Sequence, residues 1–352
     1  MFVNKHFGVL LSFSFIFFCF LISIFSYFII PDDSQYSNQM HLQIHSMSPG
    51  FKATILEVPN SSNNNKESYI RSKFFGNKFP NKEILIKKYS FDDFGINYEN
   101  YNEEIVQLKY DVFPNLNSST EIEKKYIKER KFVFGTDSFG RDVFGRIILG
   151  TRVSLSIGFI AVLISLIIGL SVGMVGGYYG GFIDKFVVAI INIFWSIPTL
   201  LLVIAISIAL GKGFWQVYIA VGLTMWVEVS RIVRGQVISE KNKDYIVATK
   251  VLGYSDLRIF IKHLLPNILG PILIICAANF ASAILIESGL SFLGIGTQPP
   301  IPSWGSMIKD NYQFIILGKG YLAFIPGISI MLLVTSFMFL GNNLTDLINK
   351  NK

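Results

Sequence analysis

Residues 153–176 read VSLSIGFIAVLISLIIGLSVGMVG, a run of 24 positions without a single charged side chain. A helix needs about 20 apolar residues to cross a hydrocarbon core of roughly 30 Å, and this run meets that requirement. An amphipathic surface helix would instead show polar residues at a regular period. The stretch therefore predicts a transmembrane helix.

Comparable apolar blocks recur along the chain. Hydrophobic residues make up 51% of the sequence and charged residues only 16%, whereas an average soluble domain carries roughly 25% charged residues. The composition therefore predicts an all-α membrane protein with six transmembrane helices. Their expected positions are about 7–30, 153–176, 186–210, 214–233, 268–290 and 322–341.

The first apolar block is too long for a cleaved signal sequence. A signal sequence has an apolar core of about 7–15 residues followed by small residues, whereas here the block extends to Ile30 and Pro31-Asp32-Asp33 follows it. We therefore expect residues 1–31 to form an N-terminal tail and an uncleaved first span.

Residues 32–130 differ from their surroundings because charged and polar residues interrupt the apolar ones. Short apolar segments at 84–86 and 105–108 predict some strand, and the charged stretch Glu121–Lys131 predicts a solvated helix that leads back to the membrane. We expect an extracytoplasmic insertion of uncertain fold here, between spans one and two. Residues 131–352 then form a five-span domain.

The loop between spans four and five sets the orientation. Seven Lys or Arg residues lie between positions 231 and 262, against three acidic residues. Short loops rich in Lys and Arg face the cytoplasm, whereas loops longer than about 60 residues are largely exempt from this rule. Six spans then place both termini in the cytoplasm, in agreement with Lys5, Lys350 and Lys352, and place residues 32–150 outside.

The same loop, residues 235–267, reads as two short helices. Gly253 ends the first, because glycine accepts a positive φ. Ser255 caps the second, with Asp256 in its first turn, and Pro266 ends it. The two helices have apolar faces formed by Tyr245, Ala248, Val251 and Leu252 in one and by Leu257, Phe260, Ile261 and Leu264 in the other.

An amphipathic helical hairpin at the inner membrane face suits two roles. It can dock on a partner protein, because it is joined rigidly to two spans. It can also lie on the lipid headgroups, and physical arguments alone leave both roles open.

The sequence of this loop resembles a known motif. Residues 244–253 read DYIVATKVLG and residues 263–267 read HLLPN, which is similar to the EAA motif of type I ATP-binding-cassette (ABC) importer permeases. The resemblance implies that the loop sits in a cleft of an ATPase subunit and transmits its closure to the spans. Val247 replaces the motif's Glu, and Thr249 its second Ala, which removes a charged contact but keeps the spacing. The coupling residues implied by the motif are Tyr245, Val247, Ala248, Thr249, Gly253, His263, Leu265 and Pro266.

The segment that leads into span two resembles the oligopeptide, dipeptide and nickel permeases, specifically the C-type member of each pair. Residues 135–142 read GTDSFGRD, and residues 150–155 read GTRVSL. Its two Asp side chains are expected to pair with Arg141, Arg146 and Arg152 near the outer headgroups, although an ordinary interfacial anchor would look the same. The candidate residues are Gly135, Asp137, Gly140, Arg141, Asp142 and Arg152.

Spans two and three contain residues that shape helices. Gly169, Gly173 and Gly177 are four residues apart, a spacing that lets helix backbones approach closely but that also arises incidentally. Pro198 lies inside span three and predicts either a kink or an unpaired carbonyl.

The longest resemblance to the peptide permeases follows span five. Residues 287–296 read ESGLSFLGIG and residues 298–305 read QPPIPSWG. Three prolines and a Trp within seven residues predict a stiff loop at the outer interface, where Trp is favoured. The resemblance implies that an external binding protein docks on this face. The candidate residues of the outer gate and this face are Glu287, Gln298, Pro299, Pro300 and Trp304.

Two carboxylates lie within spans, where an ionisable group suggests function by default. Glu228 lies three residues before Arg231, so an intrahelical ion pair explains it. Glu287 lies near the outer end of its span. For Glu287 a structural role and contact with a peptide's amino group both remain open.

The resemblance covers about residues 132–345 and implies the permease subunit of an ABC importer in a bacterial plasma membrane. Its substrate would be a dipeptide, an oligopeptide or a related solute such as nickel. The implied partners are a second, B-type permease, two ATPase subunits, an extracytoplasmic substrate-binding protein and membrane lipid, with no nucleic acid. Because the chain has no Gly-x-x-x-x-Gly-Lys-Ser/Thr motif, we expect ATP on the partner subunits and no cofactor on this chain.

The sequence contains no motif for metal binding or for catalysis by a membrane hydrolase. Cys19 and Cys276 lie in apolar blocks, and no metal-ligand spacing occurs. A membrane hydrolase would need a His-Glu-x-x-His or Gly-x-Ser-x-Gly motif, and the sequence has neither. A receptor that senses through residues 32–130 remains compatible as a second role.

Overall fold

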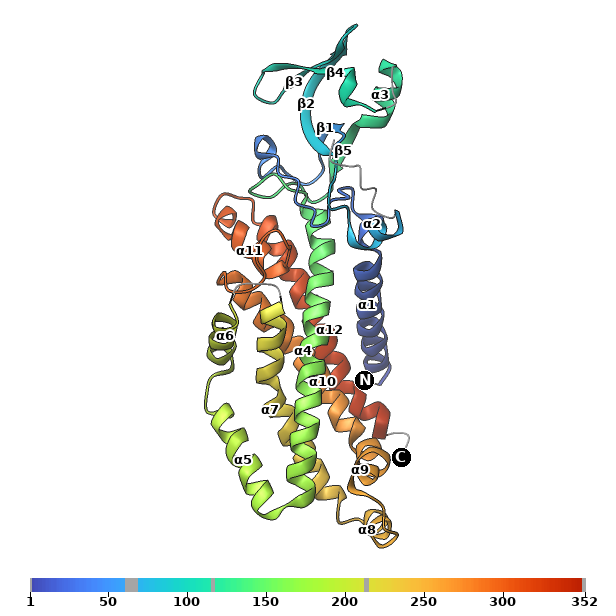
Figure 1. Cartoon of the computed structure of the whole chain (residues 1–352), viewed down its shortest axis with the longest axis vertical. Helices are drawn as coiled ribbons and strands as arrows, with labels where there is room; N and C mark the ends of the chain where they lie inside the picture. The colour runs from blue at the N-terminus through green and yellow to red at the C-terminus, as the bar shows by residue number, and fades with distance from the viewer. Residues whose placement is uncertain (1, 61–68, 115–117, 212–214, 350–352) are drawn as a thin grey trace. The chain divides into compact units, whose positions relative to one another are not determined.

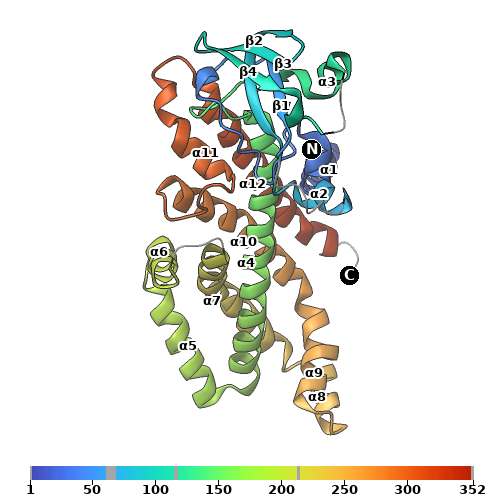
Figure 2. The same cartoon turned by 45° about the horizontal axis from the view of Figure 1, so that its top comes forward.

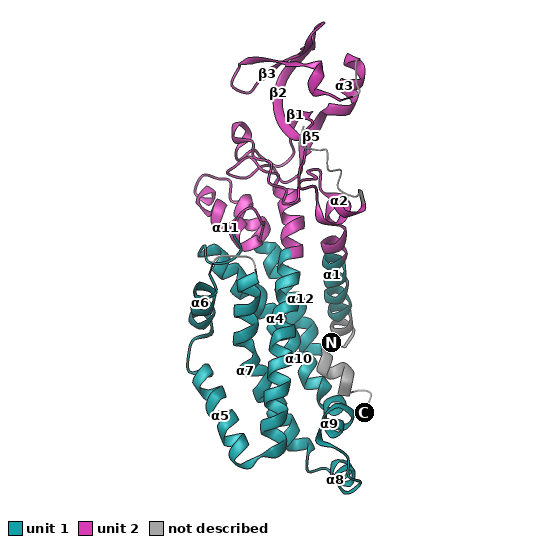
Figure 3. Cartoon of the chain, in the orientation of Figure 1, with its two compact units in different colours: residues 1–20, 153–298, 327–352 teal, residues 21–152, 299–326 magenta. Residues whose placement is uncertain are grey.

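The computed structural model describes residues 2–60, 69–114, 118–211 and 215–349. Lys350 and Lys352, which supported the expected orientation, lie outside these residues. The chain divides into two compact units (Figure 3). Unit 1 consists of Met1–Phe20, Val153–Gln298 and Gly327–Lys352, and unit 2 of Leu21–Arg152 and Pro299–Pro326.

Long apolar helices dominate the described chain, as the sequence predicted. Five of them are long and apolar enough to cross a membrane, and each contains one of the expected apolar blocks (Figure 1). They are α1 (Phe2–Ile29), α4 (Val143–Tyr179), α7 (Trp215–Glu240), α10 (Leu265–Phe292) and α12 (Tyr321–Asn349).

The third expected span is a bent pair of helices. Helix α5 (Gly181–Trp195) and helix α6 (Thr199–Ala209) meet at an angle of 87° (Figure 2). Pro198 lies at the break in an extended conformation, because it has no N–H to donate and its ring crowds the preceding turn. The kink expected at this proline is therefore a complete break. The described residues hold five spans, or six if the bent pair crosses as one.

Helices α4 and α7 pack closely along a row of glycines. A Cβ added at Gly169 would lie 2.6 Å from the Cβ of Val229, and one added at Gly173 would lie 2.8 Å from that of Val233. The pattern continues one turn further, where a Cβ at Gly177 would lie 2.9 Å from the Cβ of Val237. The four-residue glycine spacing is thus used for helix packing.

Unit 2 contains an antiparallel sheet of five strands in the order β4-β3-β2-β1-β5. The apolar segments at 84–86 and 105–108 lie in β2 and β4, so the expected strand is confirmed. Leu56, Ile86 and Ile96 form the centre of its core. The strands are β1 (Phe51–Val58), β2 (Lys82–Phe91), β3 (Gly95–Asn100), β4 (Ile105–Lys109) and β5 (Ile127–Phe132).

The helix expected over Glu121–Lys131 is wrong in its second half. Helix α3 (Ser119–Tyr126) ends where β5 begins. Pairing with β1 decides this outcome, and the charged side chains of β5 find ion-pair partners on β1 and on the next strand, β2. Lys128 reaches Glu57 on β1 at 2.8 Å, and Arg130 reaches Glu83 on β2 at 2.6 Å.

Short elements complete the described structure. Between α7 and α10 lie α8 (Asp244–Val251), α9 (Asp256–Ile259) and a π-helical turn η3 (Phe260–Leu264). The others are helices α2 (Tyr69–Phe75) and α11 (Trp304–Asn311), and 3-10 turns η1 (Leu42–Ile44), η2 (Tyr110–Val112) and η4 (Tyr312–Ile315).

Candidate functional site

Residues 244–264, here called the hairpin, have an inner face that is anchored in unit 1. Ile246 in α8, Ile259 in α9 and Leu264 in η3 are completely buried in one apolar cluster. The same cluster contains Val233 of α7 and Ile268 of α10. Burying an aliphatic side chain contributes about 1.5–3 kcal/mol, so three such anchors hold the hairpin firmly against the long helices.

The outer face of the hairpin is apolar and exposed, which is unusual for a short helical connection. Exposed apolar surface of this kind marks interaction sites. Two residues of the expected apolar faces do not belong to this surface. Leu264 points inward, and Phe260 contacts Tyr178 edge to face with ring centroids 4.7 Å apart. The hairpin surface consists of Val247 (47% exposed), Val251 (82%), Leu252 (70%), Leu257 (67%) and Ile261 (56%).

Gly253 and Ser255 lie in the turn of the hairpin, between α8 and α9. Gly253 has a φ of +74°, as expected for the residue that ends α8. Ser255 occupies the N-cap position of α9, but its side chain makes no capping hydrogen bond. The Asp256 carboxylate in the first turn instead accepts hydrogen bonds from Tyr178 and Tyr179, each at 2.8 Å.

The role expected for Pro266 is wrong. The chain does not end a helix there, because Pro266 lies in the first turn of α10, directly after the π-helical turn η3. Proline is tolerated in a first turn, where its missing N–H would have no partner. His263 lies just before it, with its ring 5.8 Å from that of Tyr254 and its carbonyl bound by Asn267 at 2.7 Å.

The remaining residues of the coupling motif divide between the two faces. Val247 and Ala248 are exposed, whereas Thr249 is buried and donates a hydrogen bond to the Ile246 carbonyl at 2.7 Å. The Tyr245 hydroxyl donates to Glu240 at 2.6 Å, and burial together with this bond raises the pKa of Tyr245 to about 12. The partly buried Leu265 begins α10. The motif residues therefore do not form one surface.

A polar clamp ties the hairpin to the turn between α4 and α5. Besides the two tyrosine hydroxyls on Asp256, the Lys241 ammonium group donates to the Gly177 carbonyl at 2.7 Å. Lys250 lies over the Tyr178 ring, 4.5 Å from its centroid. The sequence placed Asp256 only in the first turn of its helix and did not reveal the clamp, because the tyrosines that bind it lie 77 and 78 positions away.

The segment before α4 lies in unit 2, and Asp137 is its centre. Asp137 is buried and forms ion pairs with Arg141 at 2.7 Å and with Arg146 at 3.6 Å. Gly135 and Gly140 both have positive φ, and a Cβ on either would collide with a backbone carbonyl. The expected pairing of this aspartate with its neighbouring arginines is thus present.

Asp142 and Arg152 do not pair as expected. Asp142 accepts hydrogen bonds from the backbone N–H groups of Phe144 and Gly145, at 3.1 and 3.3 Å, and so caps α4. Its pKa is raised to about 6, chiefly by burial. Arg152 donates to the Phe74 carbonyl at 2.7 Å. Both side chains therefore bind backbone groups rather than each other.

The residues expected at the outer gate lie in both units. In unit 1, Glu287 is buried and accepts a hydrogen bond from Ser291 at 2.6 Å, and the Gln298 amide donates to the carbonyls of Gly294 and Gly296, both at 3.1 Å. These bonds close the turn after α10.

In unit 2, Trp304 is only 2% exposed, and its indole N–H donates to the Ile147 carbonyl at 3.1 Å. Pro299 and Pro300 are exposed. The tryptophan thus anchors its loop by burial, which leaves the two prolines as accessible residues of the expected face.

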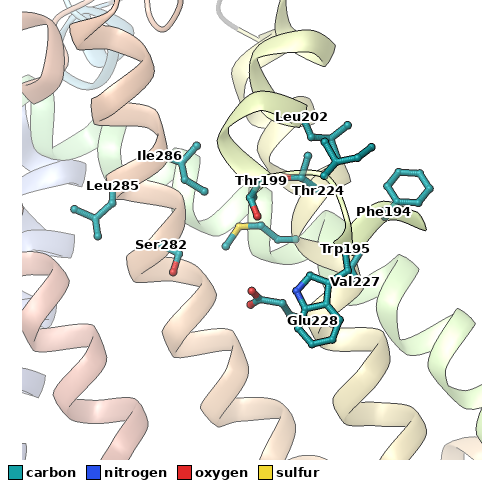
Figure 4. A pocket seen from close by; sticks show the side chains of 12 residues that line it. Phe194, Trp195, Thr199, Leu202, Thr224, Val227, Glu228, Ser282, Leu285 and Ile286 are labelled. Atoms are coloured by element: carbon teal, nitrogen blue, oxygen red, sulfur yellow. The ribbon is translucent and has the colours of Figure 1, made fainter. Parts of the chain in front are cut away.

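Unit 1 also contains a pocket of about 310 Å³ that the sequence did not reveal (Figure 4). Helices α5, α6, α7 and α10 and the break between α5 and α6 contribute to its lining, which is mostly apolar and includes Glu228. Glu228 is exposed and makes no ion pair with Arg231. Arg231 instead lies over the Trp195 ring at 3.1 Å, so the expected intrahelical pair is wrong.

Comparisons with known proteins show which proteins this chain is similar to. The family described as "Binding-protein-dependent transport system inner membrane component" matches residues 165–350. The dipeptide transport system permease protein DppC of Bacillus subtilis is 42% identical over 213 residues, which cover 60% of this chain and 67% of that protein. The oligopeptide transport system permease protein OppC of Escherichia coli is 39% identical, with coverage of 60% and 70%. The inward-facing MetNI methionine ABC transporter gives a TM-score of 0.48 at 19% identity, covering 58% of this chain and 97% of that one.

Proposed function

Because the chain belongs to the family of binding-protein-dependent transport system inner membrane components, we propose that it forms part of the translocation path of an ABC importer for dipeptides or oligopeptides. The dipeptide and oligopeptide permeases named above support this substrate class. Nickel complexes are the alternative cargo that the sequence resemblance allows.

The two-faced hairpin is the observation that carries the proposal. Its inner face is anchored by three buried aliphatic side chains, while its outer face presents Val251 and Leu252 to solvent. A rigidly anchored element with an apolar free face is suited to transmit the movement of a partner to the long helices. The proposed partner is an ATPase subunit in the cytoplasm, and Val247 makes its contact with this chain apolar rather than charged.

The full assembly would contain a second, B-type permease, two ATPase subunits that hold ATP, and an extracytoplasmic substrate-binding protein. In this proposal the chain lies in a bacterial inner membrane with both termini in the cytoplasm. The bent pair α5 and α6 serves as one span, which gives six. The proposed domains are residues 1–31, the extracytoplasmic insertion 32–130, and the permease domain 131–352 with its coupling loop 235–267.

The proposed cycle uses the hairpin as a lever. ATP binding closes the ATPase subunits, and the hairpin moves with them because its outer face is docked. The buried anchors then carry this movement into α7 and α10, which changes the side of the membrane to which the path opens. On the other side, the exposed Pro299 and Pro300 belong to the face proposed for the substrate-binding protein.

The test is ATP-dependent peptide uptake by the reconstituted assembly. Val251→Glu combined with Leu252→Glu places charge on exposed positions of the hairpin surface, so folding should persist while ATPase binding and uptake are lost. Ile105→Glu is the matched control, because Ile105 is an equally exposed aliphatic residue on β4. Normal uptake and ATPase binding by the double variant would rule out the proposed coupling.

A further inference from the structure

We propose that the pocket of unit 1 binds a cationic group of the transported solute, with the Glu228 carboxylate as its counter-ion. The inference rests on the proposed function in one respect, namely that the cation is the free ammonium group of a peptide. The pocket, the carboxylate and their surroundings are described by the structure alone.

The pocket has the form of a small-molecule site. Its interior of about 310 Å³ is partly open and is lined mainly by apolar residues such as Leu202 and Ile286, with Thr199, Thr224, Ser282 and Glu228 as the polar ones. Figure 4 shows Glu228 of α7 and Ser282 of α10 directed toward the same space. Apolar walls with a small number of polar groups are typical of ligand pockets, in which the polar groups fix orientation.

The carboxylate of Glu228 is available to a ligand. Arg231, the cation closest to it in sequence, is held over the Trp195 ring at 3.1 Å instead of pairing with it. In the described chain no ion pair involves Glu228, although the residue belongs to a span-length apolar helix. An ionisable group in such a helix normally faces a water-filled path or a partner charge.

Both helix ends at the break between α5 and α6 contribute to the pocket. Helix α5 has 15 residues and ends at Trp195, and Phe194, Trp195 and Ile197 from this end line the pocket. The C-terminal end of a helix carries a partial negative charge of about half an electron. The first turn of α6, represented in the lining by Thr199 and Leu202, carries the opposite partial charge. The two helix ends therefore offset each other, and the Glu228 carboxylate is the one charged group among the lining residues.

Glu287, the other carboxylate considered for the amino group of a peptide, does not compete for this role. It is completely buried, and the hydroxyl of Ser291 donates to it at 2.6 Å. Its surroundings stabilise the turn after α10. In this proposal the contact with a peptide's amino group therefore lies at Glu228 rather than at Glu287, for which the sequence left this contact and a structural role both open.

Thiol labelling tests the pocket without transport. In the full-length chain with Cys19→Ser and Cys276→Ser, Ser282→Cys places a single thiol on the pocket lining. We expect a cationic ammonium-ethyl methanethiosulfonate to react about tenfold faster than the anionic sulfonate-ethyl reagent, after correction for their rates with a free thiol. Glu228→Gln should abolish this preference, and Glu228→Asp should retain it.

Leu269→Cys is the control, because Leu269 is exposed on α10 but does not line the pocket. Its labelling should not depend on Glu228. Equal cation preference at Ser282→Cys with and without Glu228→Gln would overturn the proposed site, as would the absence of any preference.

Uptake by the reconstituted importer then tests the ligand. Glu228→Gln should lower uptake of Ala-Ala several-fold, and Glu228→Asp should restore part of it. Unchanged uptake in Glu228→Gln would contradict the peptide contact. If the unaltered assembly moves no peptide while the labelling preference holds, the proposed function fails but the cation site stands.

Discussion

The hydroxyl of Tyr178 donates a hydrogen bond to Oδ1 of Asp256 at 2.8 Å, which ties the last turn of α4 to the first turn of α9. Tyr179 binds Oδ2 of the same carboxylate at 2.8 Å. Both bonds join the hairpin to a helix that is not its neighbour in sequence. The position of the hairpin is therefore set by α4 as well as by α7 and α10.

Replacing both tyrosines tests this clamp. In Tyr178→Phe combined with Tyr179→Phe the rings remain, so the edge-to-face contact with Phe260 is kept while both hydrogen bonds are lost. We expect uptake per ATP hydrolysed to fall several-fold, because the hairpin is then held to the long helices by fewer contacts and transmits less of its movement. Uptake and ATP hydrolysis measured on one preparation give this ratio, and an unchanged ratio would mean that the clamp is not part of the coupling.

Gly253 should tolerate no side chain without a loss of stability. No atom lies within 4 Å of the position that a Cβ would occupy, so the cost arises only from the φ of +74°. Gly253→Ala should lower the free energy of unfolding by about 1–2 kcal/mol. Gly235→Ala is the control, because a Cβ at Gly235 also meets no atom within 4 Å but the residue lies inside α7. This variant should raise the free energy of unfolding by up to about 1 kcal/mol. Thermal unfolding in detergent compares the two variants. If both changed the stability by the same amount, the positive φ of Gly253 would not be the cause.

Asp142 should make the stability of the protein depend on pH. Burial raises its pKa from 3.8 to about 6, so the folded state binds this proton more tightly than the unfolded chain. The stabilisation that comes from protonating Asp142 in the folded state is therefore fully present below about pH 4 and is lost as the pH rises through about 6. The loss amounts to at most about 3 kcal/mol.

Asp142→Asn removes this titration but keeps a side chain that can cap α4. The variant should be more stable than the unaltered protein at pH 7, and the difference should shrink toward pH 4. Thermal unfolding of both proteins across this range measures it. A difference that is constant with pH would show that the carboxyl does not titrate there.

The ion pair between Glu83 and Arg130 should matter far more than an exposed pair on the same sheet. Burial would raise the pKa of Glu83, but hydrogen bonds from His41 and Arg130 outweigh it and lower that pKa. Arg130→Met leaves this buried carboxylate without its main partner and should cost about 3–5 kcal/mol.

Lys52→Met is the matched control, because the Lys52–Glu129 pair has side chains 57% and 60% exposed, against 11% and 6% for Arg130 and Glu83. Its cost should stay below about 1 kcal/mol. Hydrogen exchange of β2 and β5 amides reports both variants on the folded chain, and similar exchange rates would contradict the ranking.

The long helices could be predicted from sequence because a membrane requires about 20 apolar residues in one run. The strands that contain 84–86 and 105–108 could also be predicted, since short runs with β-branched residues between polar segments favour strands. Strand β5 was missed because Lys128 and Arg130 suggest a solvated helix until their partners are known. Those partners are distant in sequence, and no local pattern reveals them.

The candidate site was predictable to the same extent. The positive φ of Gly253 follows from its position after an amphipathic run, and Asp137 lies close in sequence to its arginines. The clamp on Asp256 and the pocket around Glu228 depend on helices brought together by folding. Arg231 shows the limit of local reasoning, because a tryptophan 36 positions away holds it in place of the nearby carboxylate.

Gly169, Gly173 and Gly177 form a groove on α4 into which valine side chains of α7 pack. Each valine lies against one glycine, and successive glycines are about 6 Å apart along the helix axis. If α4 slid along α7 by less than this distance, a valine side chain would clash with a side chain of α4 that lies between two glycines. In the proposed cycle α4 and α7 therefore move together, and a change in the packing between helices is expected where no such glycine row exists, as at the broken pair α5 and α6.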